Sequence, residues 1–332
     1  MDRERRGLLD AVKVAVVQGG PSSEAEVSRA SAAGVSGALE EAGHAVVRLE
    51  LEPSLGEKIR AGSFDVVFPV VHGAVGEDGA LQGLLEVIGL PYVGSDVLAS
   101  AMAMNKAIAR LVFAKALLPI ARGVALPKGD ALAGAKAARE EAGLAVVVKP
   151  AASGSAIGVS RFEATASDDQ IARGIEAAWK LDRTAIVESF VKGREITCSV
   201  LDVREGPRVL AATEIASPVD AFYTYEARYA PGRSKHTCPA KLGELEKTVH
   251  EVAIRAHVAL GCRDLSRADF IVTETEVVLL EVNTLPGMTA TSLYPEAAAA
   301  AGLSFSALCD TLVKNAHTRG ATARNAPIPL PQ

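Results

Sequence analysis

Two short segments of the sequence carry residue types that suit a metal and phosphate site. Arg267 and Asp269 stand two residues apart in the first segment, and Glu281 and Asn283 do so in the second. Both segments read as strands, and side chains two residues apart on a strand point to the same face. A turn-like run at residues 273–276 separates the segments, which predicts a hairpin centred on residue 275.

This hairpin would place Asp269 opposite Glu281 and Arg267 opposite Asn283. Paired carboxylates on buried strands are costly unless a cation neutralises them. Oxygen-only ligands of this kind suit Mg²⁺, which shares its shell with substrate phosphates. We therefore predict a metal and nucleotide site on this face. The prediction depends on the register, because a slip of one residue would turn one strand's polar set to the other face.

The loop at residues 149–158 has the composition of a phosphate-binding loop. It begins at Lys149, at the end of an apolar run, and continues as PAASGSAIG. Small residues let backbone N–H groups approach an anion closely, and the lysine adds positive charge. No Walker A motif is present. An ordinary hairpin loop is the alternative, and the predicted metal site downstream favours phosphate binding.

Residues 217–242 show no clear strand or helix period and hold three of the five tyrosines within residues 223–229. Long segments without secondary structure inside compact domains are usually functional lids or disordered. The aromatic content argues against disorder. We predict a lid that excludes water from the site.

Two further loops combine small and polar residues. Residues 283–293 follow the predicted metal strand and contain the turn Pro286-Gly287, whose backbone N–H groups would suit an oxyanion or a carboxylate. The alternative is a plain strand-to-helix connector. Residues 72–79 follow another strand, and His72 is either a substrate contact or a buried structural histidine.

The elements that would position these residues alternate between strands and helices. Strands at 12–18, 46–51 and 65–71, separated by helices, predict a parallel sheet with ligands at its carboxyl edge. We expect an α/β protein with domains at 12–104, 105–192 and 193–318. The Pro-containing tail at 319–332 reads as a frayed end.

Composition narrows the classes of partner. The chain has 332 residues, 49% hydrophobic, with a formal net charge of −5, which gives no reason to expect nucleic acid or anionic membrane as a partner. No apolar run reaches the roughly 18 residues of a membrane helix, and the N-terminus does not resemble a signal peptide. The four cysteines lack metal spacing, so we expect free thiols in the cytoplasm.

Five motifs, in order along almost the whole chain, resemble the D-alanine–D-alanine ligases of the ATP-grasp superfamily. They are GGPSSEAEVS (19–28), HGAVGEDGALQG (72–83), YVGS (92–95), YEARY (225–229) and LLEVNTLPGMT (279–289). The resemblance implies a three-domain ATP-grasp architecture with an N-terminal parallel-sheet domain, and ATP held between the central and C-terminal parts. It also implies an acyl-phosphate reaction that joins two D-alanines for peptidoglycan precursor synthesis.

The resemblance further implies a role for individual residues. For the nucleotide these are Lys106, Lys149, Ser155, Glu188, Val191 and Glu195. For the metal they are Asp269, Glu281 and Asn283, in agreement with the hairpin argument. The residues that act on the reacting groups are Glu26, Ser155, Tyr229, Arg267 and Gly287, and those that hold substrate are His72, Arg228, Ser292 and Leu293. The expected ions are Mg²⁺, for which Mn²⁺ substitutes, and a monovalent cation such as K⁺; the expected assembly is a homodimer.

The chain departs from the family pattern near the phosphates. Ser153 and Ala156 stand where a glutamate and a serine are usual, Thr224 and Arg228 replace an aspartate and a lysine, and Ser189 replaces a frequent lysine beside the adenine. These changes bear on ATP affinity and on the second substrate. A ligase for other D-amino or hydroxy acids, and a catalytically silent nucleotide-binding paralogue, are the two alternatives. The dipeptide is favoured over an ester by Tyr229, and activity by the intact metal set.

Overall fold

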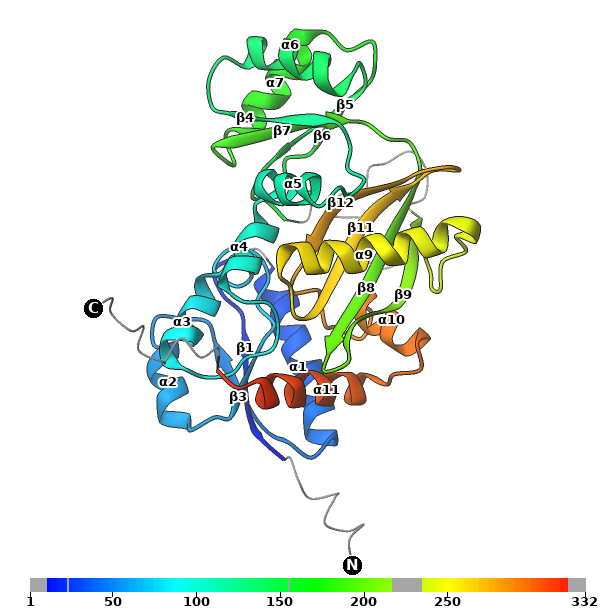
Figure 1. The fold of residues 1–332 in the computed structure, drawn as a ribbon. Helices are drawn as coiled ribbons and strands as arrows, with labels where there is room; N and C mark the ends of the chain where they lie inside the picture. The colour runs from blue at the N-terminus through cyan, green and yellow to red at the C-terminus, as the bar shows by residue number, and fades with distance from the viewer. Residues whose placement is uncertain (1–10, 23, 155, 217–234, 322–332) are drawn as a thin grey trace, which may run out of the picture.

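The computed structural model describes residues 11–22, 24–154, 156–216 and 235–321. Three β-sheets with flanking helices form its framework (Figure 1). The predicted lid falls largely on residues 217–234, which lie outside the described residues, as do Ser155, Arg228 and Tyr229.

The first unit is a parallel sheet with the order β2-β1-β3, as the alternation of strands and helices predicts. The β1 strand is buried along its length because the sheet is covered on both faces, which explains its continuous apolar run. The elements of this unit are β1 (Lys13–Gln18), α1 (Ala25–Glu41), β2 (Ala45–Glu50), α2 (Leu55–Gly62), β3 (Val66–Pro69), α3 (Ala80–Ile88) and α4 (Val97–Met104).

The second unit has an antiparallel sheet with the order β4-β7-β5-β6, covered by two alanine-rich helices (Figure 1). Alanines of α6 and α7 pack with Val146 and Val148 of the sheet. Its elements are α5 (Lys106–Lys115), β4 (Gly123–Pro127), α6 (Ala131–Ala142), β5 (Val146–Pro150), β6 (Ser160–Phe162), α7 (Asp168–Ala178) and β7 (Thr184–Ser189).

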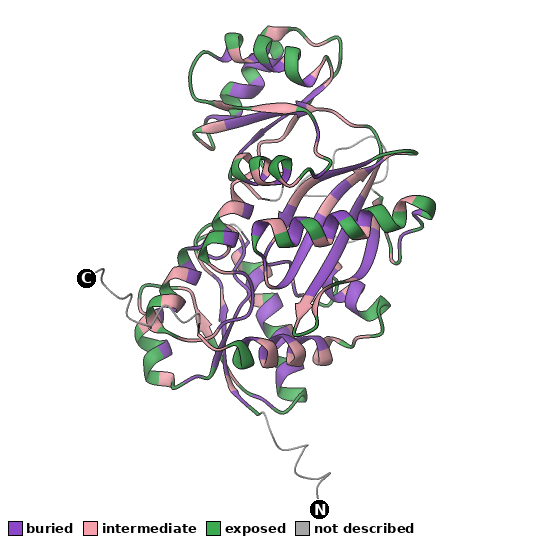
Figure 2. Ribbon diagram, in the orientation of Figure 1, coloured by how far each residue is buried: buried purple, intermediate pink, exposed green. Residues whose placement is uncertain are grey.

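The third unit has an antiparallel sheet with the order β10-β9-β8-β11-β12. Helix α9 covers one face, and Figure 2 shows the buried residues that run along β8 and β11 beside it. The elements are β8 (Arg194–Val203), β9 (Gly206–Ala216), β10 (Lys235–Thr237), η1 (Gly243–Leu245), α9 (Glu246–Leu260), β11 (Asp264–Val272), β12 (Val277–Asn283), α10 (Leu293–Ala300) and α11 (Phe305–Arg319).

The last two helices return to the first unit. Leu308 and Leu312 of α11 and Tyr294 of α10 share one hydrophobic cluster with Val14 and Val16 of β1. Residue 193, the predicted boundary, lies between the last strand of the second sheet and the first strand of the third. Helices α10 and α11, although they follow the third sheet, complete the core of the first.

Asp264 at the start of β11 ties the first and third units together. This fully buried carboxylate accepts hydrogen bonds from the Gly94 N–H (2.7 Å) and from Asn315 Nδ2 (2.7 Å). Both terminal nitrogens of Arg319 also contact it, and Arg319 Nη2 donates to the Tyr92 carbonyl at 2.8 Å. The prediction that the tail begins at residue 319 is wrong at that residue, because Arg319 ends α11 in an ion pair.

One predicted helix, at residues 102–118, is instead parts of two. Helices α4 and α5 meet at Asn105 with a bend of 103°. The Asn105 side chain accepts hydrogen bonds from the N–H groups of Ala107 and Ile108 and so caps α5. The bend leaves Lys106 in the first turn of α5, where its Nζ reaches Glu281 of β12 at 3.1 Å.

Candidate active site

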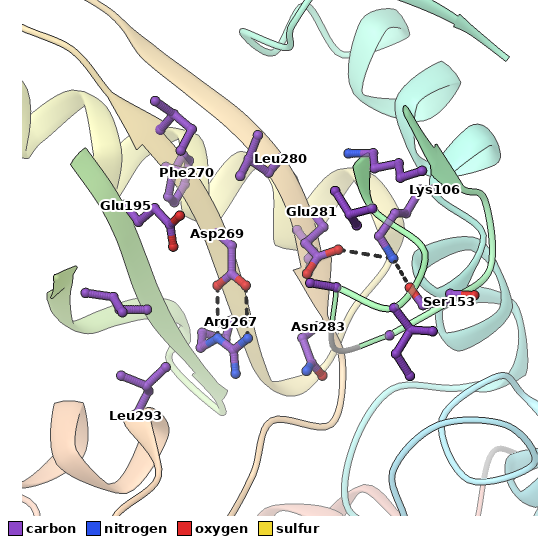
Figure 3. A pocket seen from close by; sticks show the side chains of 18 of the residues that line it. Lys106, Ser153, Glu195, Arg267, Asp269, Phe270, Leu280, Glu281, Asn283 and Leu293 are labelled. Atoms are coloured by element: carbon purple, nitrogen blue, oxygen red, sulfur yellow. Dashed lines mark hydrogen bonds and ion pairs between the residues drawn. The ribbon is translucent and has the colours of Figure 1, made fainter. Parts of the chain in front are cut away.

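The hairpin formed by β11 and β12 has the predicted pairing at its functional end. Arg267 pairs with Asn283, and Asp269 pairs with Glu281. The register shifts between this end and the tip, because Phe270 pairs with Leu279 and Leu280 is left over as a bulge. Figure 3 shows both pairs of residues along one side of the hairpin.

The bulge at Leu280 decides which face Glu281 occupies. Val277, Leu279 and Val282 belong to the cluster under α9. Strict alternation from Leu279 would point Glu281 at that apolar cluster. With one extra residue, Leu280 and Glu281 both line the opposite, cavity side. The sequence-based hairpin, centred on residue 275 throughout, did not include this bulge.

Both carboxylates of the hairpin have cationic partners. Arg267 donates two hydrogen bonds of 2.9 Å to Asp269, and Thr197 donates one of 2.6 Å to the same carboxylate. Glu281 Oε2 lies 3.1 Å from Lys106 Nζ, which also donates to the Ser153 carbonyl at 2.7 Å (Figure 3). Each of the two neighbouring, partly buried carboxylates thereby has a cation beside it, which offsets their mutual repulsion.

The donor set suits a hard cation. Asp269 and Glu281 supply carboxylate oxygens and Asn283 supplies an amide oxygen, which also accepts the Leu285 N–H at 2.9 Å. Within the described residues, no three His, Cys, Asp or Glu side chains gather as a metal cluster. The candidate set is therefore two carboxylates and an amide, a set of oxygens that fits Mg²⁺ and not zinc.

Glu188 of β7 is held between two cations. Its Oε1 contacts Lys149 Nζ, and its Oε2 lies 3.0 Å from Arg110 Nη1. All three side chains are buried or nearly so. Lys149 and Glu188 were predicted nucleotide contacts, whereas Arg110 was not predicted. Its only sequence signal is its position one helical turn after Lys106.

One cavity of about 920 Å³ joins these groups. Every predicted site residue that the structure describes contributes to its wall, including the groups placed farthest apart in the sequence. They are Glu26, His72, Lys106, Lys149, Glu188, Val191, Glu195, Arg267, Asp269, Glu281, Asn283, Gly287, Ser292 and Leu293.

At the end of the cavity near α1, the structure favours a different acid from the predicted one. The Glu26 side chain is 86% exposed and pairs with Arg29. Glu24, at the N-cap of α1, is only 9% exposed and also lines the cavity. Its carboxylate lies beside Gly73, within 3.4 Å of where a Cβ on that glycine would be. Glu24, not Glu26, is thus the acid that faces the interior.

Two buried groups on the loop between β3 and α3 lie near Glu24. His72 Nε2 and Glu77 Oε2 are shielded from solvent and have no hydrogen-bond partner among the described residues. Burial lowers the pKa of His72, against the opposing effect of the Glu24 charge. Burial raises the pKa of Glu77 to about 8, although the hydrogen bond from the Gly73 N–H opposes the rise. At neutral pH both groups therefore favour their uncharged forms.

The cavity also meets the start of α10, and the loop before that helix lies against α1, where the Met288 N–H donates to Ser31 Oγ at 3.4 Å. A Cβ on Gly287 would lie 2.9 Å from Ser292 Oγ, so a larger residue at 287 would displace the Ser292 side chain. Ser292 is the N-cap residue of α10, and its Oγ accepts the Thr289 N–H at 3.1 Å while leaving the first N–H groups of the helix without a side-chain cap. Backbone N–H groups at a helix start favour an anion.

Family models match most of the chain. The model described as D-ala D-ala ligase C-terminus matches residues 112–314, and that described as D-ala D-ala ligase N-terminus matches residues 48–95. A D-alanine–D-alanine ligase of Desulforudis audaxviator is 44% identical over 308 residues, which cover 92% of this chain and 99% of the relative. The chain belongs to the D-alanine–D-alanine ligase family.

Solved structures of ligases agree with this membership. The D-alanine–D-alanine ligase of Bacillus anthracis, complexed with ATP, has a TM-score of 0.77 at 28% identity, covering 93% of this chain and 98% of that one. The VanG D-Ala:D-Ser ligase of Enterococcus faecalis has a TM-score of 0.79 at 30% identity, covering 92% and 99%. The predicted ATP-grasp fold is confirmed by these ligase structures.

Within the described residues, no single helix is a candidate membrane span and no cysteine is part of a disulfide. No single helix there has both the length and the hydropathy needed to cross a bilayer. All four cysteines are free thiols, and burial raises the pKa of Cys198 and Cys262 in particular.

Proposed function

We propose that this chain joins two D-alanine molecules to D-alanyl-D-alanine, with cleavage of ATP to ADP and phosphate, in the synthesis of peptidoglycan precursors. One observation carries the proposal: a single cavity unites Lys106 and Lys149 with the acidic face of the β11–β12 hairpin. Family membership supports the substrates, since the similar ligases act on D-alanine.

The nucleotide occupies the end of the cavity between the second and third sheets. Glu188, Val191 and Glu195 hold the adenine and ribose, and Lys106 and Lys149 hold the phosphates. Positioning and charge neutralisation supply most of the catalysis in phosphoryl transfer. The two lysines meet that need. Lys106 now contacts Glu281, which a metal ion would take over, and Lys149 now contacts Glu188, which it can leave when phosphate binds.

Asp269, Glu281 and Asn283 hold Mg²⁺ in this proposal. The ion, when bound, neutralises the charge of the transferring phosphoryl group. Thr197 and Arg267 keep the Asp269 carboxylate in place, and release of Glu281 by Lys106 frees the lysine for phosphate. Mn²⁺ as a substitute and an activating K⁺ remain expectations.

The first D-alanine lies at the α1 end, where its ammonium group meets a carboxylate. We assign this contact to Glu24 in place of Glu26, because Glu24 is buried beside Gly73 and His72. Ser155 and Tyr229, expected to assist, lie outside the described residues. The carboxylate of this substrate receives the γ-phosphoryl group and becomes an acyl phosphate.

The second D-alanine binds near the start of α10. Its carboxylate is held by Ser292 and the Leu293 N–H, with Arg228 contributing from the lid, and its amine attacks the acyl carbon as phosphate leaves. Arg267 and the Gly287 N–H stabilise the charge that develops on the oxygen. A lid over residues 217–242 protects the acyl phosphate from water.

A second candidate acceptor is D-serine or another D-amino or hydroxy acid. The 30% identity to a D-Ala:D-Ser ligase supports this alternative, as do the substitutions at residues 153, 156, 224 and 228. A homodimer and a cytoplasmic location complete the proposal, and the four free thiols support that location.

The test is incubation with ATP, Mg²⁺ and D-alanine, with phosphate release and product mass both measured. D-Alanyl-D-alanine with one phosphate per dipeptide is the expected result. Phosphate release that requires added D-serine or a hydroxy acid would select the second candidate. Neither phosphate nor product with any acceptor would refute the ligase proposal.

A further inference from the structure

Arg110 is a cation beside the cavity that does not itself line it. It lies on α5, behind Glu188, with only 12% of its side chain exposed. Its Nη1 pairs with Glu188 Oε2 at 3.0 Å, and its Nη2 donates to the Ala121 carbonyl at 2.8 Å. Two hydrogen bonds to partners on different elements fix the planar guanidinium in place.

Glu188 is fixed from its backbone side as well. Gly123 of β4 pairs with Glu188 of β7 in the sheet. A Cβ on Gly123 would lie 2.4 Å from the Val187 carbonyl and 2.7 Å from Glu188 Cα. The two strands therefore pack too closely for any side chain at residue 123, and the carboxylate of Glu188 has little freedom to move.

The charges at this point are unequal. Two cations, Arg110 and Lys149, contact one buried carboxylate, so one positive charge is left for an anionic ligand. Lys149 lines the cavity and Arg110 does not. When phosphates enter, Lys149 is the partner that can leave Glu188, and Arg110 is the partner that stays. Without Arg110, departure of Lys149 would leave a buried carboxylate unpaired, which is strongly unfavourable.

We infer that Arg110 is a positioning residue for the nucleotide: it holds the charge of Glu188 so that Lys149 is released to the phosphates. The inference rests on the proposed roles of Lys149 and Glu188, and it adds a residue that acts through them without touching the ligand. Arg110 should therefore affect the binding of the nucleotide and not that of the two amino-acid substrates.

The test is a double-mutant cycle on ADP binding, measured by calorimetry with the full chain. Arg110→Met is expected to raise the Kd for ADP by about tenfold or more, which is roughly 1.4 kcal/mol. In a Glu188→Gln background the same change is expected to cost less than about threefold, because the carboxylate charge is already gone. Arg110→Lys should restore part of the loss, since it keeps the charge and loses the fork.

Steady-state kinetics separates this role from a purely structural one. Arg110→Met should raise KM for ATP and leave KM for D-alanine unchanged, whereas a loosened fold would weaken both substrates. Arg122→Met is the matched control, because the Arg122 side chain is 70% exposed and its ion pair with Glu141 is long, at 4.0 Å. This variant should change neither the KM for ATP nor the KM for D-alanine.

The inference would be overturned if Arg110→Met raised the Kd for ADP by the same factor in the wild-type and Glu188→Gln backgrounds, or if it left that Kd unchanged. If Arg110→Met does not fold, the Arg110→Lys cycle is read in the same way with smaller factors. The cycle measures binding alone, so a wild-type chain that binds ADP but makes no dipeptide would refute the ligase proposal without deciding this one.

Discussion

At the scale of single residues, the site depends on the partners of its acids. Asp269, Glu188 and Glu281 each contact a lysine or arginine, whereas Glu77 has one oxygen without a partner among the described residues. When ligands bind, the three paired carboxylates must exchange these cations for new partners. Glu77 instead carries a proton at neutral pH, because burial raises its pKa.

Glu281→Gln tests the metal assignment. Loss of one carboxylate ligand is expected to lower phosphate release and dipeptide formation together by at least about 100-fold. The circular dichroism spectrum should not change, because the amide is isosteric. Glu276→Gln, at the exposed turn of the same hairpin, is the control and should keep full turnover. Normal turnover in Glu281→Gln would remove Glu281 from the metal site.

Glu77→Gln tests the buried carboxyl through pH. Burial raises the folded-state pKa of Glu77 from 4.5 to about 8. Between those values the folded protein binds a proton that the unfolded chain has released, so this group makes the fold less stable as pH rises. The Tm of the variant, relative to the wild type, should therefore increase steadily from about pH 5 to about pH 8. Glu40→Gln, at an exposed position of α1, should follow the wild type at every pH. Parallel Tm curves for wild type and Glu77→Gln would contradict the shifted pKa.

At the scale of elements, local patterns predicted strands, helices and which residues share a face. The i, i+2 spacing of Arg267 and Asp269 gave the correct facing set because a strand has a period of two. The bulge at Leu280 was not predicted, since Leu280 resembles its apolar neighbours in the sequence. The sequence also could not separate Glu24 from Glu26, because both stand at the same helix start and only the packing of that start against residue 73 distinguishes them.

Arg110 shows a further limit of sequence reasoning. Its position in α5 suggested only another charged residue of an amphipathic helix. Its partner, Glu188, comes from a strand 78 residues later. A pairing between distant elements has no local signal, so one sequence without relatives does not reveal it.

Gly123→Ala tests the close packing of β4 on β7. The added Cβ would meet backbone atoms at 2.4 and 2.7 Å, which cannot move aside as a side chain can. We expect a loss of more than about 2 kcal/mol in the free energy of unfolding, measured by denaturant titration. Gly129→Ala is the control in the same region, because the nearest atom to its Cβ is 3.8 Å away. Equal stability of the two variants would show that the strands can separate freely.

At the scale of the whole molecule, Asp264 joins the first unit to the last helix. Asp264→Asn keeps the size of the side chain and suits the positive φ of 64° at this position. It leaves Arg319 without a counter-charge, so we expect a loss of about 2–3 kcal/mol in unfolding free energy. Glu205→Gln, exposed in the turn after β8, should stay within about 0.5 kcal/mol of the wild type. A wild-type unfolding curve for Asp264→Asn would mean that the junction does not depend on this charge.

The return of α11 to the first sheet has a consequence for how the protein is made. The apolar side of α1 is covered by α11, which is synthesised more than 260 residues after it. During translation the apolar side of α1 therefore stays exposed until α11 has been made, although domains usually fold in the order of their synthesis. Nascent chains that stall before residue 305 should therefore be the ones that chaperones retain, because α11 is then still missing from the core that it shares with α1.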